Sequence, residues 1–180
     1  MIFFTSDLHF RHNKEFIYGP RGFDNIDDHD RTIIENWNSV VRPCDTVYVL
    51  GDVMLKDNEG GKLCWDQLKG QKKIILGNHD SNPRIDVLRT CHDTKILGYA
   101  TMVRIKGRCY YLSHYPTMTG NFAIDRERGK IVYNLCGHSH TKDRFLDLDK
   151  GPIYHVEVDC HNMTPVSIDE IIRDIDREMK

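Results

Sequence analysis

Several features that would assign a protein class at once are missing from this sequence. No apolar run approaches the roughly 20 residues of a membrane-spanning helix, and the first residues lack the basic and apolar regions of a secretion signal. The six cysteines are scattered and form no Cys-x-x-Cys pair. This pattern favours reduced thiols over a disulfide framework, so we expect a cytoplasmic protein.

The sequence also lacks an excess of basic residues. Its formal net charge is -2, so no overall positive field exists to attract nucleic acid or anionic membrane. A nucleic-acid partner would require a local basic patch. No repeat, low-complexity tract or linker divides the 180 residues, and 39% hydrophobic with 29% charged residues is normal for a folded protein. We expect one domain over residues 1–180.

Short apolar runs alternate with helical patterns in the first half of the chain. The apolar runs predict buried strands over residues 2–4, 45–52 and 72–80, and apolar residues at helical spacing predict helices over 33–41 and 63–68. Pro43 and Gly70 follow the two helices, where such residues commonly end a helix. This alternation is typical of an α/β protein with parallel strands.

The second half of the chain reads as strands followed by one helix. Residues 95–105 and 108–116 flank a Lys106-Gly107 turn and predict an antiparallel hairpin. Further strands are predicted over 130–140 and 152–159. The last segment, 167–180, is predicted to be a helix, since Ser167 and Glu170 form a capping box before an apolar stripe.

Metal-binding side chains follow five of the predicted strands. The carboxyl ends of strands are where ligand sites form in open α/β sheets, because the loops there converge. The candidate ligands are Asp7, His9, Asp52, Asn78, His114, His138 and His140. They are too many for one ion, but a bridging carboxylate would divide them into two incomplete shells. Mixed nitrogen and oxygen ligands suit Mn, Fe, Co, Ni or Zn.

The ordered motifs DLH, GD, GNHD, H and GHSH, between residues 7 and 140, resemble those of the calcineurin-like metallophosphoesterase superfamily. The resemblance implies an α/β fold, a two-sheet β-sandwich flanked by helices. It implies two divalent ions, one held by Asp7, His9, Asp52 and His140. The second would be held by Asp52, Asn78, His114 and His138, with Asp52 as the bridge.

The resemblance also implies a reaction. A hydroxide between the two cations would attack the phosphorus, and His79 would act as a catalytic residue beside the scissile phosphate. Asp80 corresponds to the acidic position that orients this histidine, raising its pKa and fixing its tautomer. His12 and Arg11 follow the first motif closely, so we expect them to reach the substrate.

The substrate class is narrowed by what surrounds the motifs. The GDxxDRG and GNHE stretches of the related protein phosphatases are absent, which disfavours a protein substrate. A domain of this length favours a small phosphodiester resembling a nucleotide, such as a cyclic nucleotide. Phosphomonoesters are a second possible substrate class because His79 is present. The alternatives are a nucleic-acid-processing nuclease or phosphatase, or a metal-binding module without catalysis.

Overall fold

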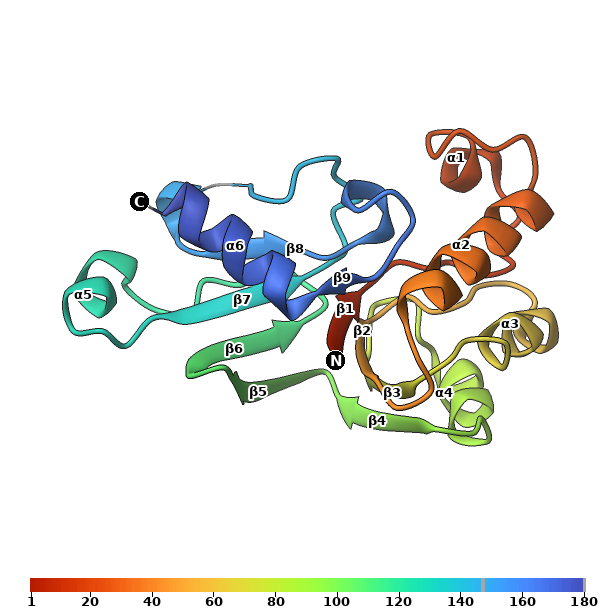
Figure 1. The fold of residues 1–180 in the computed structure, drawn as a ribbon. Coiled ribbons are helices and arrows are strands. Elements are labelled where there is room, and N and C mark those ends of the chain that lie inside the picture. The colour runs from red at the N-terminus through yellow and green to blue at the C-terminus, as the bar shows by residue number, and fades with distance from the viewer. Residues whose placement is uncertain (147, 180) are drawn as a thin grey trace.

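The computed structural model describes residues 1–146 and 148–179 and places their strands in two sheets (Figure 1). The first sheet has the order β4-β3-β2-β1-β9, in which β1 to β4 are parallel and β9 is antiparallel to β1. Its strands are β1 (Ile2–Thr5), β2 (Thr46–Leu50), β3 (Gln71–Ile75), β4 (Thr94–Gly98) and β9 (Val166–Ser167).

The second sheet has the order β5-β6-β7-β8. Its first pair is antiparallel and the remaining pairs are parallel. Its strands are β5 (Ala100–Ile105), β6 (Arg108–Ser113), β7 (Val132–Cys136) and β8 (Ile153–His155). Together the two sheets and their flanking helices confirm the predicted two-sheet α/β fold.

The helices flank the sheets, with α2, α3 and α4 on the outer side of the first sheet (Figure 1). The longer helices are α2 (Ile26–Val40), α3 (Asn58–Trp65), α4 (Asn82–Arg89) and α6 (Ile168–Glu178). The shorter ones are α1 (Glu15–Tyr18), α5 (Phe122–Glu127) and the 3-10 turns η1 (Leu148–Lys150) and η2 (Val158–Cys160). Within the described residues, no helix has the length and apolar character needed to cross a bilayer.

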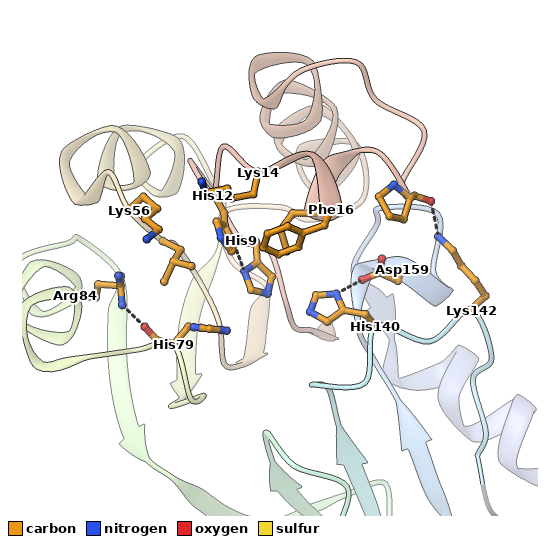
Figure 2. Close-up of a pocket in the computed structure, with 13 residues that line it drawn as sticks. His9, His12, Lys14, Phe16, Lys56, His79, Arg84, His140, Lys142 and Asp159 are labelled. Atoms are coloured by element: carbon orange, nitrogen blue, oxygen red, sulfur yellow. Dashed lines mark hydrogen bonds and ion pairs between the residues drawn. The ribbon is translucent and has the colours of Figure 1, made fainter.

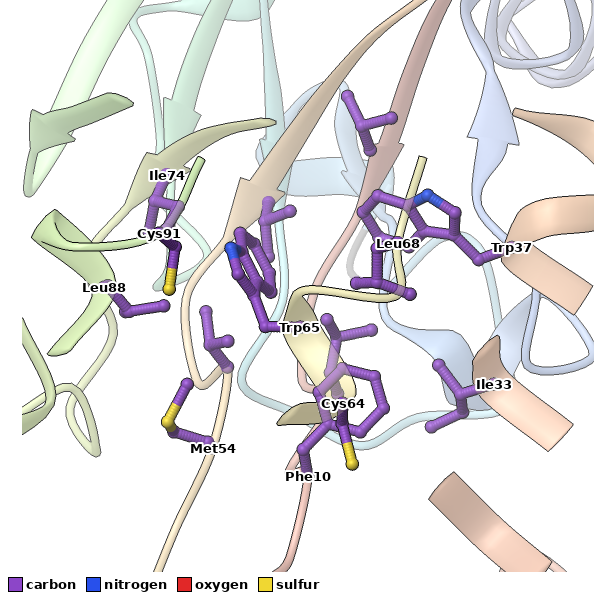
Figure 3. Close-up of a cluster of buried hydrophobic side chains, with 14 of the residues drawn as sticks. Phe10, Ile33, Trp37, Met54, Cys64, Trp65, Leu68, Ile74, Leu88 and Cys91 are labelled. Atoms are coloured by element: carbon purple, nitrogen blue, oxygen red, sulfur yellow. The ribbon is translucent and has the colours of Figure 1, made fainter. Parts of the chain in front are cut away.

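The central strands β1 and β2 of the first sheet carry apolar side chains on both faces because each face covers a different core. In β1, Phe3 packs into the outer cluster with the helices, while Phe4 packs into the inner cluster between the sheets. Successive side chains point to opposite faces, so a continuous apolar run fills both clusters. Figure 3 shows the outer cluster, in which the Trp37 and Trp65 ring centroids lie 6.4 Å apart.

The predicted hairpin is wrong in its first strand. Residues 95–105 divide at the exposed Tyr99, so that β4 joins the first sheet beside β3 and only β5 pairs with β6. Gly98 has a φ of 112°, a conformation open mainly to glycine, and it turns the chain from one sheet to the other. Gly98 is the one local sign of this division, since a glycine inside a strand pattern often marks a bend, and the other residues of the run are compatible with one strand.

Candidate metal centre

The seven predicted ligands lie in loops at the carboxyl ends of strands from both sheets. Backbone hydrogen bonds hold the loops together: the amide of Asp7 donates to the Gly51 carbonyl at 3.1 Å, and that of His9 donates to the Asp52 carbonyl at 3.0 Å. From the second sheet, the amide of Gly137 donates to the His114 carbonyl at 2.9 Å. The amide of His138, also from the second sheet, donates to Asp7 Oδ2 at 2.9 Å, so the ligand loops of the two sheets meet.

The ligand side chains converge in two groups that meet at Asp52. In the first group, His9 Nε2 lies 3.9 Å from Asp7 Oδ1 and 3.7 Å from Asp52 Oδ2, and His140 Nε2 lies 3.7 Å from Asp7 Oδ1. Atoms that each lie about 2 Å from one ion are separated by roughly 3 to 4 Å, so these distances suit a shared cation.

The second group lies near the same carboxylate oxygen of Asp52. His114 Nε2 is 3.6 Å from Asp52 Oδ2 and 2.8 Å from Asn78 Oδ1. The Asn78 oxygen is also 3.0 Å from His138 Nδ1. One oxygen of Asp52 thus faces both groups, which is the position that a bridging ligand would need.

Buried polar atoms in the first group have no partner among the described residues. Asp7 Oδ1 and His9 Nε2 are buried without a hydrogen bond, and their side chains are 0% and 2% exposed. Burial, with the nearby charge of Asp7, raises the pKa of Asp52 to about 6, because the opposing effects of His114 and of the His79 amide are smaller than the cost of burying the charge. Divalent cations would satisfy the orphaned atoms and neutralise the charge, so the residues fit the metals that the sequence implies.

The backbone of the candidate ligands is strained. Five of them have a positive φ although none is glycine: Asp7 (56°), His9 (50°), Asp52 (55°), His138 (76°) and His140 (49°). This conformation costs roughly 1 to 2 kcal/mol for an ordinary residue. The five ligands are among eleven non-glycine residues with positive φ in the described chain, and such a concentration of strain is typical of a functional site.

Two glycines of the motifs make room for the carboxylates. A side chain at Gly77 would collide with Asp52 Oδ1, and one at Gly137 would collide with Asp7 Oδ2. Each glycine precedes a candidate histidine or asparagine ligand, so the loop can pass directly over a carboxylate. The glycines of GNHD and GHSH are therefore required by close approach of the backbone.

Behind His140 lies a buried ion pair that sequence reasoning missed. His140 Nδ1 is 3.2 Å from Asp159 Oδ2, and Asp159 also accepts from Arg21 at 2.7 and 3.0 Å. Arg21 additionally donates to the Asp7 carbonyl at 2.8 Å. Burial opposes ionisation of Asp159, but the hydrogen bonds from His140 and Arg21 hold its pKa well below the usual range. Asp159 thereby directs Nε2 of His140 toward Asp7.

We expect Asp159→Asn to weaken metal binding while leaving the fold intact. A carboxylate behind a histidine ligand fixes its tautomer and raises its basicity, and loss of such a group typically costs roughly 10- to 100-fold in metal affinity. Titration calorimetry with Mn²⁺ would measure this loss. Asp174→Asn is the matched control, since Asp174 also pairs with an arginine, Arg144, but lies on α6. Equal affinities of both variants would contradict the role of Asp159.

The structure corrects the expectation for Asp80. Its Oδ2 accepts from the backbone amides of Asp52 at 2.9 Å and Gly77 at 2.8 Å, and its Oδ1 accepts from Val53 at 3.2 Å. The carboxylate is buried, whereas the neighbouring His79 lines the cavity with 42% of its side chain exposed. Asp80 is therefore bonded to the backbone of the Asp52 loop, and no hydrogen bond joins its carboxylate to the His79 ring among the described residues.

Of the two expected substrate contacts, only His12 faces the site. It lines the cavity, and its Nδ1 lies 3.2 Å from His9 Nδ1. Burial lowers the pKa of His12 to about 4, so it is neutral near pH 7. Its contact with substrate remains a prediction.

Arg11, in contrast, does not reach the cavity. Its guanidinium pairs with Asp27 at 2.5 Å, Asp30 at 3.6 Å and Asp57 at 3.8 Å. These three carboxylates hold it toward α2 and α3, so nothing in its contacts supports the expected substrate contact, which stays a prediction. Arg21, which also lies near the N-terminus, forms an ion pair with Asp159.

A cavity of about 830 Å³ opens beside the first ligand group (Figure 2). His9, His79 and His140 belong to its lining, so the candidate metal centre is accessible from it. The other lining residues are His12, Lys14, Phe16, Ile17, Pro20, Leu55, Lys56, Arg84, Lys142 and Asp159. None of the lysines, nor Phe16 or Arg84, belongs to a motif that the sequence made visible.

Comparison with known proteins gives one family and several related sequences. Residues 1–153 match the family model described as a calcineurin-like phosphoesterase superfamily domain. An uncharacterised protein, MJ1445 of Methanocaldococcus jannaschii, is 31% identical over 98% of this chain and 92% of its own. The gene 66 protein of Mycobacterium phage L5 is 32% identical over 77% of this chain and 76% of its own.

The fold has a solved counterpart. The crystal structure of AQ665 from Aquifex aeolicus, a protein of unknown function, superposes with a TM-score of 0.72 at 25% identity. The similarity covers 98% of both chains.

Proposed function

Because the chain belongs to the calcineurin-like phosphoesterase superfamily, we propose that it is a dinuclear-metal hydrolase of small, nucleotide-like phosphodiesters. The observation that carries this proposal is the position of Asp52 Oδ2. This oxygen lies 3.7 Å from His9 Nε2 and 3.6 Å from His114 Nε2, between two groups of nitrogen and oxygen ligands. One carboxylate oxygen shared by two groups supports a pair of ions, each with open positions.

The chemistry follows from this arrangement. Two divalent ions of Mn, Fe, Co, Ni or Zn would supply Lewis-acid activation of water and neutralise charge on the phosphoryl group. A water oxygen forms the new bond to phosphorus, the bond to the leaving oxygen breaks, and that oxygen takes up a proton. In this mechanism water is the nucleophile, and the protein's ligands would hold and orient the metal ions.

His79 is the side chain best placed to deliver that proton. Its Nε2 lies 4.0 Å from Asp52 Oδ2, and its ring faces the cavity. Its backbone amide donates to Asp52 Oδ1 at 2.9 Å, which fixes the residue beside the bridging carboxylate. A histidine in this position can donate to a phosphoryl oxygen or to the leaving oxygen.

The test is hydrolysis of bis-p-nitrophenyl phosphate and p-nitrophenyl phosphate by protein loaded with Mn²⁺ or treated with a chelator. We expect metal-dependent turnover with a preference for the diester. His79→Ala should keep its bound Mn²⁺ but lose about 100-fold or more in kcat, the usual contribution of a general acid. His92→Ala is the control, since His92 is exposed and follows α4, outside the site.

Two results would overturn the proposal. Turnover of neither ester by protein with metal bound would favour a metal-binding module without catalysis. Turnover that survives complete removal of metal would exclude the metal mechanism. An unchanged kcat in His79→Ala would refute the role of that histidine alone.

A further inference from the structure

The cavity lining contains more cationic side chains than are needed to bind one phosphate group. Its lining holds four cationic side chains: Lys14, Lys56, Arg84 and Lys142. Within the described chain, none of the four forms an ion pair with a carboxylate. Asp159 is the one acidic residue of this lining, and the Arg21 guanidinium already pairs with it at 2.7 Å. The net charge of -2 therefore conceals a local basic surface.

The cations stand on both sides of the candidate metal centre. In Figure 2, Lys56 and Arg84 lie on the side of His79, whereas Lys142 lies on the opposite side, beyond His140. Arg84 is held in place, because its Nη1 donates to the His79 carbonyl and to Ser81 Oγ at 3.0 Å. A phosphate bound at the metals would thus have positive charge to either side along the cavity.

Phe16 adds an aromatic surface to the same cavity. It lies on α1, is 69% exposed and meets the His12 ring edge-on, with the centroids 5.6 Å apart. Ile17, Pro20 and Leu55 also line this part. An exposed phenylalanine among cations, next to a phosphoester site, offers a face on which a nucleobase can stack.

We infer that the cavity binds a single-stranded oligonucleotide, with a base on Phe16 and phosphates flanking the scissile one beside Lys56 and Lys142. This inference rests on the proposed function and narrows its substrate class. A cyclic mononucleotide has one phosphate, which the metals alone would neutralise, so the four cations would have no counterpart. A nucleotide chain carries further phosphates in both directions. The hydrolysed bond is again between phosphorus and one ester oxygen, with water as the second reactant.

The experiment compares kcat/KM of the Mn²⁺-loaded protein on four substrates. They are a single-stranded DNA tetranucleotide, the RNA of the same sequence, a cyclic mononucleotide and ATP. We expect at least tenfold higher kcat/KM on one or both tetranucleotides than on the other two, and a decline as salt rises. Comparison of DNA with RNA identifies the sugar. Equal or better turnover of the cyclic mononucleotide or of ATP would overturn the inference.

Three variants test the named contacts. Lys56→Gln, Lys142→Gln and Phe16→Ala should each lower the ratio of tetranucleotide to bis-p-nitrophenyl phosphate turnover, by about tenfold for Phe16→Ala. The matched controls are Lys95→Gln on β4 and Tyr99→Ala, since Lys95 is exposed and Tyr99 is 70% exposed, both outside the cavity lining. Equal effects in variants and controls would overturn the inference.

Failure of the inference can be told from failure of the proposed function. Turnover of bis-p-nitrophenyl phosphate without preference for the tetranucleotide leaves the function standing and removes the inference. If no ester is hydrolysed, binding is measured instead of turnover. Fluorescence anisotropy of a labelled tetranucleotide with Mn²⁺-loaded His79→Ala protein then shows whether the cavity binds an oligonucleotide. Binding that weakens in the Lys56→Gln and Lys142→Gln backgrounds supports the cavity as an oligonucleotide site, and absence of binding overturns it.

Discussion

Asp52→Asn is expected to remove the carboxylate shared by the two metal sites and to lower kcat by about 1000-fold. This is the upper range for loss of one preorganised electrostatic group. One Oδ2 atom faces both His9 and His114, so the substitution affects both ions at once. An amide is isosteric but carries no charge, and it cannot neutralise two divalent cations. Metal analysis of the purified variant should give less than one equivalent of Mn²⁺, against two for the unmodified protein.

Stability gives a second readout of the same substitution. A ligand that binds only the folded state stabilises it, by about 2.7 kcal/mol at 100 times the dissociation constant. Mn²⁺ should therefore raise the Tm of the unmodified protein and have little effect on Asp52→Asn. In chelator, the variant should be at least as stable, because burial already raises the pKa of Asp52 to about 6.

Asp24→Asn serves as the control for a lost carboxylate, since Asp24 is exposed in the loop before α2. It should retain both the metal content and the Mn²⁺-dependent rise in Tm. Full activity with two bound ions in Asp52→Asn would refute the bridging role and, with it, the dinuclear centre.

Asp80→Asn is expected to destabilise the protein by about 3 kcal/mol and to weaken metal binding. Three buried backbone amides, those of Asp52, Val53 and Gly77, donate to this carboxylate. Hydrogen bonds to a charged acceptor contribute roughly 1.5 to 3 kcal/mol each, and an asparagine would direct its own N–H groups at one or more of these donors. Urea unfolding at fixed Mn²⁺ measures the loss of stability, and calorimetry measures the metal affinity.

A double-mutant cycle separates the two roles considered for Asp80. If it holds the Asp52 loop, Asp80→Asn lowers Mn²⁺ affinity by the same factor with His79 or with alanine at that position. If it acted through the His79 ring, the substitution would leave metal affinity unchanged and cost no further kcat in the His79→Ala background.

Asp45→Asn is the matched control for this cycle. Asp45 is a buried carboxylate that accepts from the Arg42 amide at 2.8 Å. It precedes β2, whereas the ligand loops follow the strands. Its loss should reduce stability without changing Mn²⁺ affinity. A drop in affinity there would show that general destabilisation, not the Asp52 loop, explains the behaviour of Asp80→Asn.

The burial of β1 and β2 was visible in the sequence, but the assignment of strands to sheets was not. Phe3 and Phe4 are consecutive apolar residues, and residues 47–50 are apolar at every position, which indicates burial on both faces. Residues 95–105 read as one strand because both of its parts are strand-forming, and only pairing with β3 or β6 separates them at Tyr99. Pairing between strands depends on the stacking of the sheets, which local propensity does not encode.

By itself, the sequence determined which residues could act as metal ligands and that they would follow strand ends, because motif order and strand patterns are local properties. It also located the helix start at Ser167, whose side chain accepts from the Glu170 amide. Only the tertiary structure decided which partners the charged side chains bind. Asp80 caps backbone amides, Arg11 pairs with acids near α2, and Arg21 reaches Asp159 across 138 positions of the chain. These choices follow from which partner lies within reach once the sheets are packed, and a buried charge takes the nearest group that can satisfy it.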